Sequence, residues 1–286
     1  MITRDVEASA VADLALSPPR AALAASGDDG VILLPVRVTL EDPGDPASSP
    51  RIVHVGQGQP DLYDREVVVI ADDGPQWFRL RSLTVRGTAK ALEPCTFRVV
   101  PRRVVAWDYG SLRQVPTPAG GPSPPPPSFS ASDDKGAAEP LCSPNLEAAL
   151  HSSRVMILAS RSGKGTPFAV PLWFVTHRGR LYTTTSSSSW TVRNVVASPQ
   201  VALMLGGERR EDASRLVVSG QARALRRAPP PVVVARIAWL YYLQPQFAAV
   251  ELSHIRSWAT RLRYYAQSRA AYVVITPQSA TECRAP

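Results

Sequence analysis

A run of hydroxyl-bearing side chains, TTTSSSSWTVRN at residues 183–194, offers the clearest chemistry in this chain. The end of the run starts a short helix pattern, which Pro199 terminates. At such a helix start, free backbone N–H groups and the positive end of the helix dipole favour a phosphate. Arg193 can add a guanidinium that contacts two phosphate oxygens, and Asn194 can add a further donor. The run therefore predicts a phosphate site, although residues 186–189 could instead form only a polar turn.

The strand pattern around this run occurs twice in the chain. The sequence LAASGDDGVILLPVRVTL, residues 23–40, corresponds to LASRSGKGTPFAVPLWFV, residues 158–175, and later segments correspond in the same order. Under this alignment two pairs of residues coincide, Pro35 with Pro171 and Gly87 with Gly220. A repeat of roughly 100 residues or more exceeds the periods of solenoid repeats, so it indicates a duplicated domain.

The two copies differ where the phosphate site would lie. In the first copy the corresponding stretch reads QGQPDLYDREVVV, which places Asp61, Asp64 and Glu66 at the position of the phosphate. Like charges there would repel a phosphate by about 1 kcal/mol or more for each close contact. We therefore expect a phosphate site in the second copy alone.

Closely spaced apolar strands with Gly and Asp turns dominate both copies, which favours small antiparallel barrels over βαβ units. Helices are few. One begins at Pro144, one begins at Trp190, and the segment 231–267 reads as two helices broken near Pro245. This last segment has no counterpart in the first copy. The predicted fold class is therefore mainly β with a few helices, as two tandem β-barrels with a helical insert in the second.

The stretch between the copies is rich in Pro, Gly, Ser and Ala, which cannot bury enough apolar area to become ordered. We interpret residues 114–144 as a linker. The expected domains are then residues 1–113, with a degenerate cofactor site, and residues 145–286, with the phosphate motif and the insert at 231–267. The length of the linker would let the second copy pack beside the first.

Short motifs in both copies resemble one family. In the second copy they are PLWF at residues 171–174, GRLYTTT at 179–185, VRNVVASPQVAL at 192–203 and VSGQA at 218–222. The first copy retains VRGTA and a closing strand that ends in VVAWD. Together they resemble the flavin-binding split β-barrel proteins, the pyridoxamine 5′-phosphate oxidase-like superfamily with its deazaflavin-dependent branch. In such proteins two barrels pair around the cofactor, so the resemblance implies that the two copies form an intrachain pseudo-dimer.

The same resemblance implies roles for individual residues around a bound flavin. The residues that would hold the ribityl phosphate are Thr184, Thr185, Ser187, Ser188 and Arg193, with Thr191 and Asn194 beside them. Trp173 would lie against the ring system, and Trp107 of the first copy would close the site; both could instead be packing residues. Thr191 stands where many family members carry Lys, so the site has one positive charge fewer. FMN is the expected cofactor, and the deazaflavin coenzyme F-420 is the alternative.

The charge of the chain is divided unevenly between the copies. Residues 1–140 contain 14 Lys and Arg against 18 Asp and Glu, a net of −4. Residues 141–286 contain 18 Lys and Arg against 6 Asp and Glu, a net of +12. The second copy is thus the half suited to an anionic ligand, although a basic surface without a specific partner would give the same count.

Several classes of function are disfavoured by the residue patterns. The three cysteines and four histidines show no metal-ligand spacing, so we expect no metal site, and haem on His254 is a minor alternative. No segment is apolar enough to span a membrane and no signal peptide is evident, so a cytoplasmic location is expected. Basic and aromatic residues do not alternate along one strand face, so nucleic acid is not an expected partner.

The expected function is that of a flavin- or deazaflavin-dependent oxidoreductase, which transfers hydride to or from a small organic substrate. No residue is a convincing general acid or base, so the catalytic residues stay unassigned. The alternative is a non-catalytic protein that binds a cofactor or ligand after duplication has degraded the enzyme. Aromatic residues of the insert could form core or could wall a bulky substrate. The sequence leaves open whether chains associate further into homo-oligomers.

Overall fold

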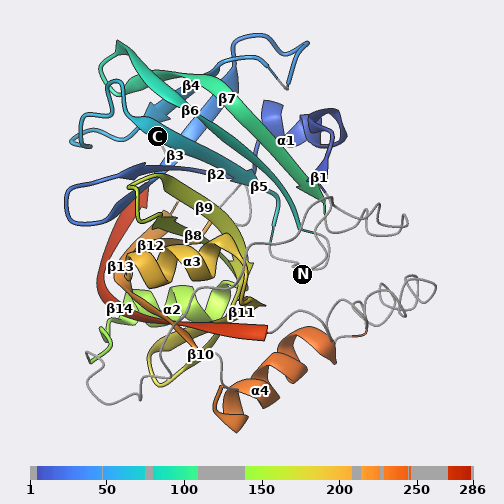
Figure 1. The fold of residues 1–286 in the computed structure, drawn as a ribbon, viewed down its shortest axis with the longest axis vertical. Helices are drawn as coiled ribbons and strands as arrows, with labels where there is room; N and C mark the ends of the chain where they lie inside the picture. The colour runs from blue at the N-terminus through green and yellow to red at the C-terminus, as the bar shows by residue number, and fades with distance from the viewer. Residues whose placement is uncertain are drawn as a thin grey trace.

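The computed structural model describes residues 5–46, 48–74, 80–108, 139–207, 214–225, 229–243, 245 and 270–284, which form two seven-stranded sheets and a few helices (Figure 1). The elements of the first half are β1 (Asp5–Val6), η1 (Ala8–Val11), α1 (Ala12–Leu16), β2 (Arg20–Ser26), β3 (Val31–Leu40), β4 (Arg51–Val55), β5 (Glu66–Asp72), β6 (Arg81–Glu93) and β7 (Thr96–Asp108). Those of the second half are α2 (Pro144–Ser152), β8 (Val155–Arg161), β9 (Pro167–Trp173), β10 (Val175–His177), β11 (Arg180–Ser186), α3 (Trp190–Ala197), β12 (Gln200–Gly206), β13 (Ser214–Leu225), α4 (Pro231–Ile237), the π-helical turn η4 (Ala238–Tyr242) and β14 (Ala270–Arg284).

Both sheets have the strand order of a split barrel. The first runs β1-β7-β4-β3-β2-β5-β6, and β6 also pairs with β7, so six strands close into a barrel. The second runs β10-β11-β14-β13-β12-β8-β9. Only Phe174 separates β9 from β10, so these two strands act as one interrupted strand equivalent to β3. The predicted fold class, two tandem split barrels with a helical insert in the second, is therefore confirmed.

The duplication is visible in the register of individual residues. Each barrel has a register shift at a glycine that faces a proline, Gly87 opposite Pro101 and Gly220 opposite Pro277. A Cβ on Gly220 would lie 2.5 Å from the carbonyl oxygen of Thr276, so only glycine fits the close approach of the two strands. This explains why the aligned glycines occur in both copies.

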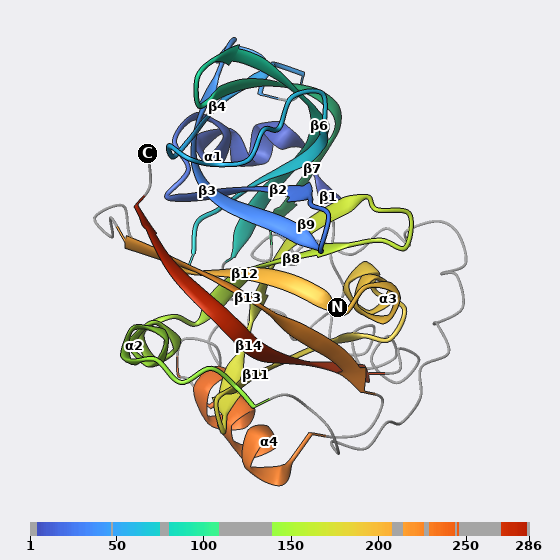
Figure 2. The same cartoon turned by 90° about the vertical axis from the view of Figure 1, so that its left-hand side faces the viewer.

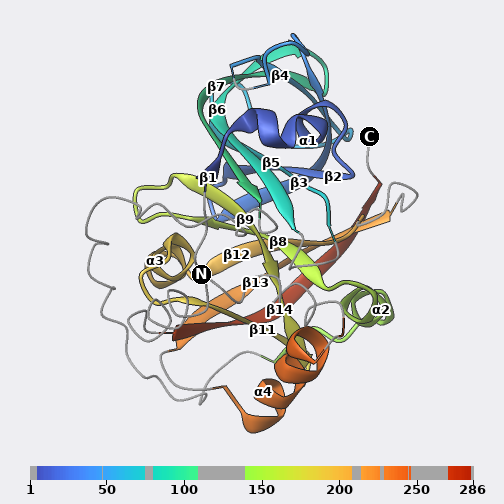
Figure 3. The same ribbon diagram turned by 90° about the vertical axis from the view of Figure 1, so that its right-hand side faces the viewer.

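A helix packs against the core of each barrel, just before β2 in the first barrel and just before β8 in the second. Val11 and Leu14 of η1 and α1 belong to the core of the first barrel, where α1 lies against the strands (Figure 3). Leu146 and Leu150 of α2 belong to the core of the second barrel. Figure 2 shows α2 beside that barrel. The sequence predicted α2, but it did not predict η1 and α1, because their short run of alanines carries little periodicity.

The two barrels meet through a shared apolar cluster, which we call the seam. Its ten buried residues are Ala22, Ala24, Leu33, Val68 and Ile70 from the first barrel, and Ile157, Ala159, Ala169, Ala202 and Met204 from the second. Strands β2, β3 and β5 thereby lie against β8, β9 and β12, and the barrels stack one above the other in all three views (Figures 1, 2 and 3). Burial of this apolar surface holds the two barrels together.

The seam residues occupy equivalent positions in the two barrels. The matching cross-strand triplets are Leu33–Ala24–Val68 in the first sheet and Ala169–Ala159–Ala202 in the second. The matching pairs beside them are Ala22 with Ile70 and Ile157 with Met204. An interface that uses the same patch on both sides is isologous, the kind that relates two subunits by a twofold axis. The two halves therefore pair as an intrachain pseudo-dimer.

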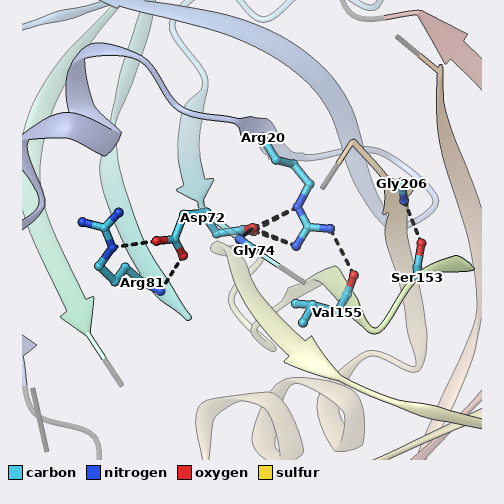
Figure 4. A network of polar contacts seen from close by, with 8 residues as sticks. Arg20, Asp72, Gly74, Arg81, Ser153, Val155 and Gly206 are labelled. Atoms are coloured by element: carbon cyan, nitrogen blue, oxygen red, sulfur yellow. Dashed lines mark hydrogen bonds and ion pairs between the residues drawn. The ribbon is translucent and has the colours of Figure 1, made fainter. Parts of the chain in front are cut away.

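A buried ion pair joins Arg20 to Asp72 near this approximate axis. Figure 4 shows the pair and its contacts. The Arg20 guanidinium donates to both carboxylate oxygens of Asp72 at 3.0–3.2 Å and to the carbonyl oxygen of Val155 at 3.0 Å. Both charged side chains are 0% exposed. Burial raises the pKa of Asp72, and the Arg20 guanidinium opposes that rise. By strand register Arg20 is the equivalent of Val155, so this contact joins a position to its own counterpart.

The linker and part of the insert fall outside the description. Residues 114–138 of the linker and residues 246–267 of the insert are not among the described residues. The first helix of the insert begins at Pro231 as α4 and continues as η4 to Tyr242. The second helix beyond Pro245 stays a prediction, as do the domain boundaries.

We expect Arg20→Met to lower the free energy of unfolding by about 3–5 kcal/mol, because the substitution leaves the Asp72 carboxylate buried without its counter-ion. Urea unfolding followed by fluorescence measures this loss. Arg98→Met removes an ion pair with Glu41 whose side chains are both exposed, and it should cost less than about 1 kcal/mol. Equal effects of the two substitutions would contradict the role given to Arg20.

We expect Gly220→Ala to cost about 1–3 kcal/mol, because the new Cβ meets backbone atoms of Thr276 that cannot move aside. Gly163→Ala is the control, since its Cβ would lie 3.5 Å from the Cβ of Ala197, an ordinary contact. Thermal unfolding of both variants checks the prediction, and a stable Gly220→Ala protein would show that the strands can separate there.

Candidate functional site

The hydroxyl-rich run leaves strand β11 and enters helix α3 through a turn. Along β11, Thr183 pairs with Val273 of the core and is fully buried, whereas Thr184 pairs with Tyr272 and is half-buried. Thr185 is half-buried and pairs with Ala271. Because side chains alternate along a strand, Thr183 and Thr185 share the core face and Thr184 lies on the outer face. The three threonines therefore do not all point to one site.

Serines organise the turn and cap the helix. The Ser186 and Ser188 hydroxyls lie 2.9 Å apart, and Ser187 is buried. Ser189 is the N-cap of α3, and its hydroxyl accepts from the backbone N–H of Val192 at 3.3 Å. The N–H of Arg193 then makes the first bond of the helix, to the carbonyl of Ser189 at 3.1 Å. The cap satisfies one amide of the first turn and leaves the start of the helix suited to an anion.

The side chains of α3 divide into two groups. Arg193 is half-buried, and its guanidinium carbon lies 5.5 Å from the centre of the exposed Trp190 ring. Thr191 is 4% exposed, and Asn194 is buried and donates to the Ser160 hydroxyl at 3.1 Å. Arg193 therefore presents charge near the helix start, while Asn194 anchors the helix to β8. The side-chain amide of Asn194, which was predicted to donate to a phosphate, is thus already engaged in this anchoring bond.

The corresponding stretch of the first barrel has a different structure. Residues 56–65 join β4 to β5 without a helix. Asp61 and Asp64 are exposed; Asp61 accepts from the N–H of Tyr63 at 2.9 Å, and Asp64 pairs with Lys90. The first barrel thus has acidic side chains and no helix start where the second barrel has hydroxyls and α3.

Trp173 lies beneath the helical insert. Its ring centre is 4.7 Å from that of Tyr241, and it is 8% exposed in a cluster with Val233 and Ile237 of α4. The buried Tyr241 hydroxyl donates to the carbonyl of Arg154 at 3.0 Å and to that of Phe174. The insert therefore covers the outer face of the second barrel at the break between β9 and β10.

Trp107 lies on the face of the first barrel that turns towards the second. Cross-strand pairs join Trp107 to Ser82, Ser82 to Asp72 and Asp72 to Arg20, and residues opposite one another point to the same face. In the second barrel Trp173 pairs with Val155, the residue that Arg20 contacts. Both tryptophans therefore lie near one end of the seam, outside its ten residues. Helix α3 lies beyond the other end of β8, about 20 Å along a seven-residue strand.

Two arginines, Arg178 and Arg236, act on His177 at the end of β10. Burial lowers the pKa of His177, and repulsion from Arg178 and Arg236 lowers it further. Within the described ranges no cluster of three or more His, Cys, Asp or Glu side chains could hold a metal ion. His254, the candidate haem ligand, lies outside those ranges. No helix of the described chain is long and apolar enough to cross a membrane.

Three residues that support α3 were not predicted from the sequence. Ser189 caps the helix, Ser160 holds Asn194, and the Arg161 guanidinium donates to the hydroxyl of Ser198, the C-cap residue, at 3.2 Å. A serine directly before a helix pattern is a cap signal that could have identified Ser189. The partners from β8 depend on packing between segments distant in sequence, which no local pattern reveals.

Comparison with known proteins relates the second barrel to one family. Residues 142–248 match the family model described as pyridoxamine 5′-phosphate oxidase. The comparison with curated proteins gave no match. With the strand order described above, the match identifies a split barrel of the pyridoxamine 5′-phosphate oxidase-like kind.

Several solved structures also resemble the chain. A putative pyridoxamine 5′-phosphate oxidase from Listeria innocua is 16% identical with a TM-score of 0.34, and the match covers 48% of this chain and 94% of that one. The heme storage protein HutZ from Vibrio cholerae is 15% identical with a TM-score of 0.35, over 49% and 92%. A FAD-binding protein from Mesorhizobium loti is 17% identical with a TM-score of 0.32, over 50% and 94%.

We expect Tyr241→Phe to lower the free energy of unfolding by about 1–2 kcal/mol, because the carbonyls of Arg154 and Phe174 lose their shared donor. The same variant should be cleaved faster by trypsin within the insert, since the hydroxyl ties η4 to the barrel. Tyr63→Phe, at an exposed position, is the control and should change neither measurement. An unchanged cleavage rate for Tyr241→Phe would show that packing alone holds the insert.

Proposed function

We propose that this chain, which contains a pyridoxamine 5′-phosphate oxidase-like split barrel, is a flavin-dependent oxidoreductase that acts on a small organic substrate. The observation that carries the proposal is the difference between the two barrels. The second has a serine-capped helix with Arg193 at the end of β11, and the first has the acidic residues Asp61 and Asp64 instead. Only the second barrel is therefore suited to the phosphate of a flavin nucleotide.

The donors of the second barrel fit a phosphate monoester. The segment from Thr183 to Val195 contains seven Ser and Thr hydroxyls before the helix, one Arg and no carboxylate. Thr184, Thr185 and Ser188 are half-buried, which reduces screening by water without closing the position off. In the proposal Thr184, Ser187 and Ser188 hold the phosphate with the first-turn amides, and Arg193 supplies the opposite charge. Thr185, which the sequence also assigned to the phosphate, lies on the core face of β11 and is left out of this set.

The rest of the cofactor would lie outside the packed seam and extend from α3 towards the end of the seam that carries the two tryptophans. In this arrangement Trp107 of the first barrel closes the end of the cofactor site that is farthest from α3. Trp173, which packs under Tyr241, supports the cofactor at the same end. A bound flavin or deazaflavin supplies hydride transfer, and the residues of this chain bind it, orient it and exclude water. FMN is the preferred cofactor, with the deazaflavin coenzyme as the alternative. We propose that each chain has a single cofactor site and that this site holds no metal ion. We propose further that the protein works in the cytoplasm.

Binding of FMN and of the deazaflavin coenzyme by the full chain, measured by titration calorimetry and by the spectrum of the purified protein, tests the cofactor. Arg193→Met should weaken the preferred cofactor about tenfold or more, since one charge-assisted contact to the phosphate is lost. Arg178→Met is the matched control, because this exposed arginine lies on the β10–β11 turn and not on α3.

The outcomes separate the alternatives. Binding of FMN that is weakened by Arg193→Met and unchanged by Arg178→Met supports the site. Tight binding without turnover of any reducible substrate would favour a cofactor- or ligand-binding protein instead of an enzyme. Failure of the wild type to bind either cofactor would refute the proposal.

A further inference from the structure

Arg161 connects three parts of the molecule. It ends strand β8, and its Nε donates to the hydroxyl of Ser198 at the end of α3, at 3.2 Å. One terminal nitrogen of the same guanidinium donates to the carbonyl oxygens of Gly27 and Gly30 in the first barrel, at 2.9 and 3.3 Å. These carbonyls belong to the turn between β2 and β3. A single half-buried side chain therefore joins α3 to the opposite barrel.

The contact has a weaker counterpart across the approximate twofold axis. By strand register Arg161 is the equivalent of Ser26, and the Ser26 hydroxyl donates to the carbonyl of Gly165 in the β8–β9 turn. Each barrel thus makes a side-chain hydrogen bond to a turn of the other barrel, the β2–β3 turn in one direction and the β8–β9 turn in the other. Only Arg161 carries a charge, and only Arg161 also reaches a helix. The charged contact is therefore made by the barrel that has α3.

The guanidinium of Arg161 suits the end of a helix, where its Nε donates to the Ser198 hydroxyl. The last carbonyls of a helix carry partial negative charge, and a cation in the last turn stabilises them. Next to Arg161 on β8, the Ser160 hydroxyl holds Asn194 in the middle of α3. Two adjacent residues of β8 thereby fix the helix at two points, and one of the two is itself held by the first barrel.

We propose that Arg161 is a positioning residue through which the first barrel sets the place of α3, and with it the anion site at the start of that helix. This inference rests on the proposed function for its consequence on binding. It assigns the first barrel a role although that barrel has no phosphate site of its own. Because α3 is only eight residues long, a displacement at its end moves its start as well.

The test compares two arginines that both cross the seam. Arg86 of the first barrel donates to the carbonyl of Pro167 at 3.2 Å, and no bond to α3 is described for it. Arg161→Met and Arg86→Met therefore each remove one guanidinium that links the barrels, but only the former releases α3. Arg161→Lys, which keeps the charge but not the fork of donors, and Ser198→Ala, which removes only the bond to the helix, complete the set.

The first measurement is hydrogen exchange of the α3 amides in the full chain without ligand. Arg161→Met should lower protection of these amides about tenfold, and Arg86→Met should leave it within about twofold. Ser198→Ala should give a loss similar to that of Arg161→Met, and Arg161→Lys a smaller one. Equal loss of protection with both arginine variants, or none with Arg161→Met, would overturn the proposal. If Arg161→Met does not fold, Ser198→Ala and Arg161→Lys decide the same question.

The second measurement is affinity for FMN or for the deazaflavin coenzyme, whichever the wild type binds. Arg161→Met should weaken it about fivefold or more, and the double variant with Ser198→Ala should lose no more than Arg161→Met alone, because both act through one bond. A purely additive loss would contradict action through α3. If the wild type binds neither cofactor, the proposed function fails, and the exchange of the α3 amides still decides whether Arg161 positions the helix.

Discussion

The burial of one apolar surface by two halves of the same chain determines the rest of this structure. The seam uses the same five strand positions from each barrel, so its packing imposes an approximate twofold axis. The ion pair of Arg20 and Asp72 lies at that axis and reaches across it to the Val155 carbonyl. The pairing of the barrels about that axis therefore fixes where the parts used in the proposed function lie, namely α3, Trp107 and Trp173.

Within this symmetric frame the two halves differ in chemistry. The β-strands and their glycine bulges are alike, because each barrel must close in the same way. The connections between strands are not alike. The second barrel has a capped helix between β11 and β12, and the first has an exposed acidic loop between β4 and β5. The framework thus restricts the strands, and the connections are where the two copies have acquired different properties.

Much of the fold could be predicted from the sequence, because strand alternation and the aligned glycines are local signals. The position of β3, the start of α2 and the limit of α3 at Pro199 all followed from such patterns. The site was less predictable. The run of serines indicated the turn, but it did not indicate that Thr183 points into the core or that Asn194 donates a hydrogen bond to Ser160. Those outcomes depend on which face of a strand is buried, and on a partner residue 34 positions away along the chain.

Joining two subunits into one chain also removes a restriction on what can stand at a symmetry axis. In a dimer of identical subunits every residue near the axis meets a copy of itself, so a buried arginine there would face a second arginine. Here position 20 holds Arg, and its counterpart holds Val155, which offers a carbonyl oxygen to the guanidinium. The covalent connection lets an unsymmetrical pair occupy a place where identical subunits would have to put two like charges.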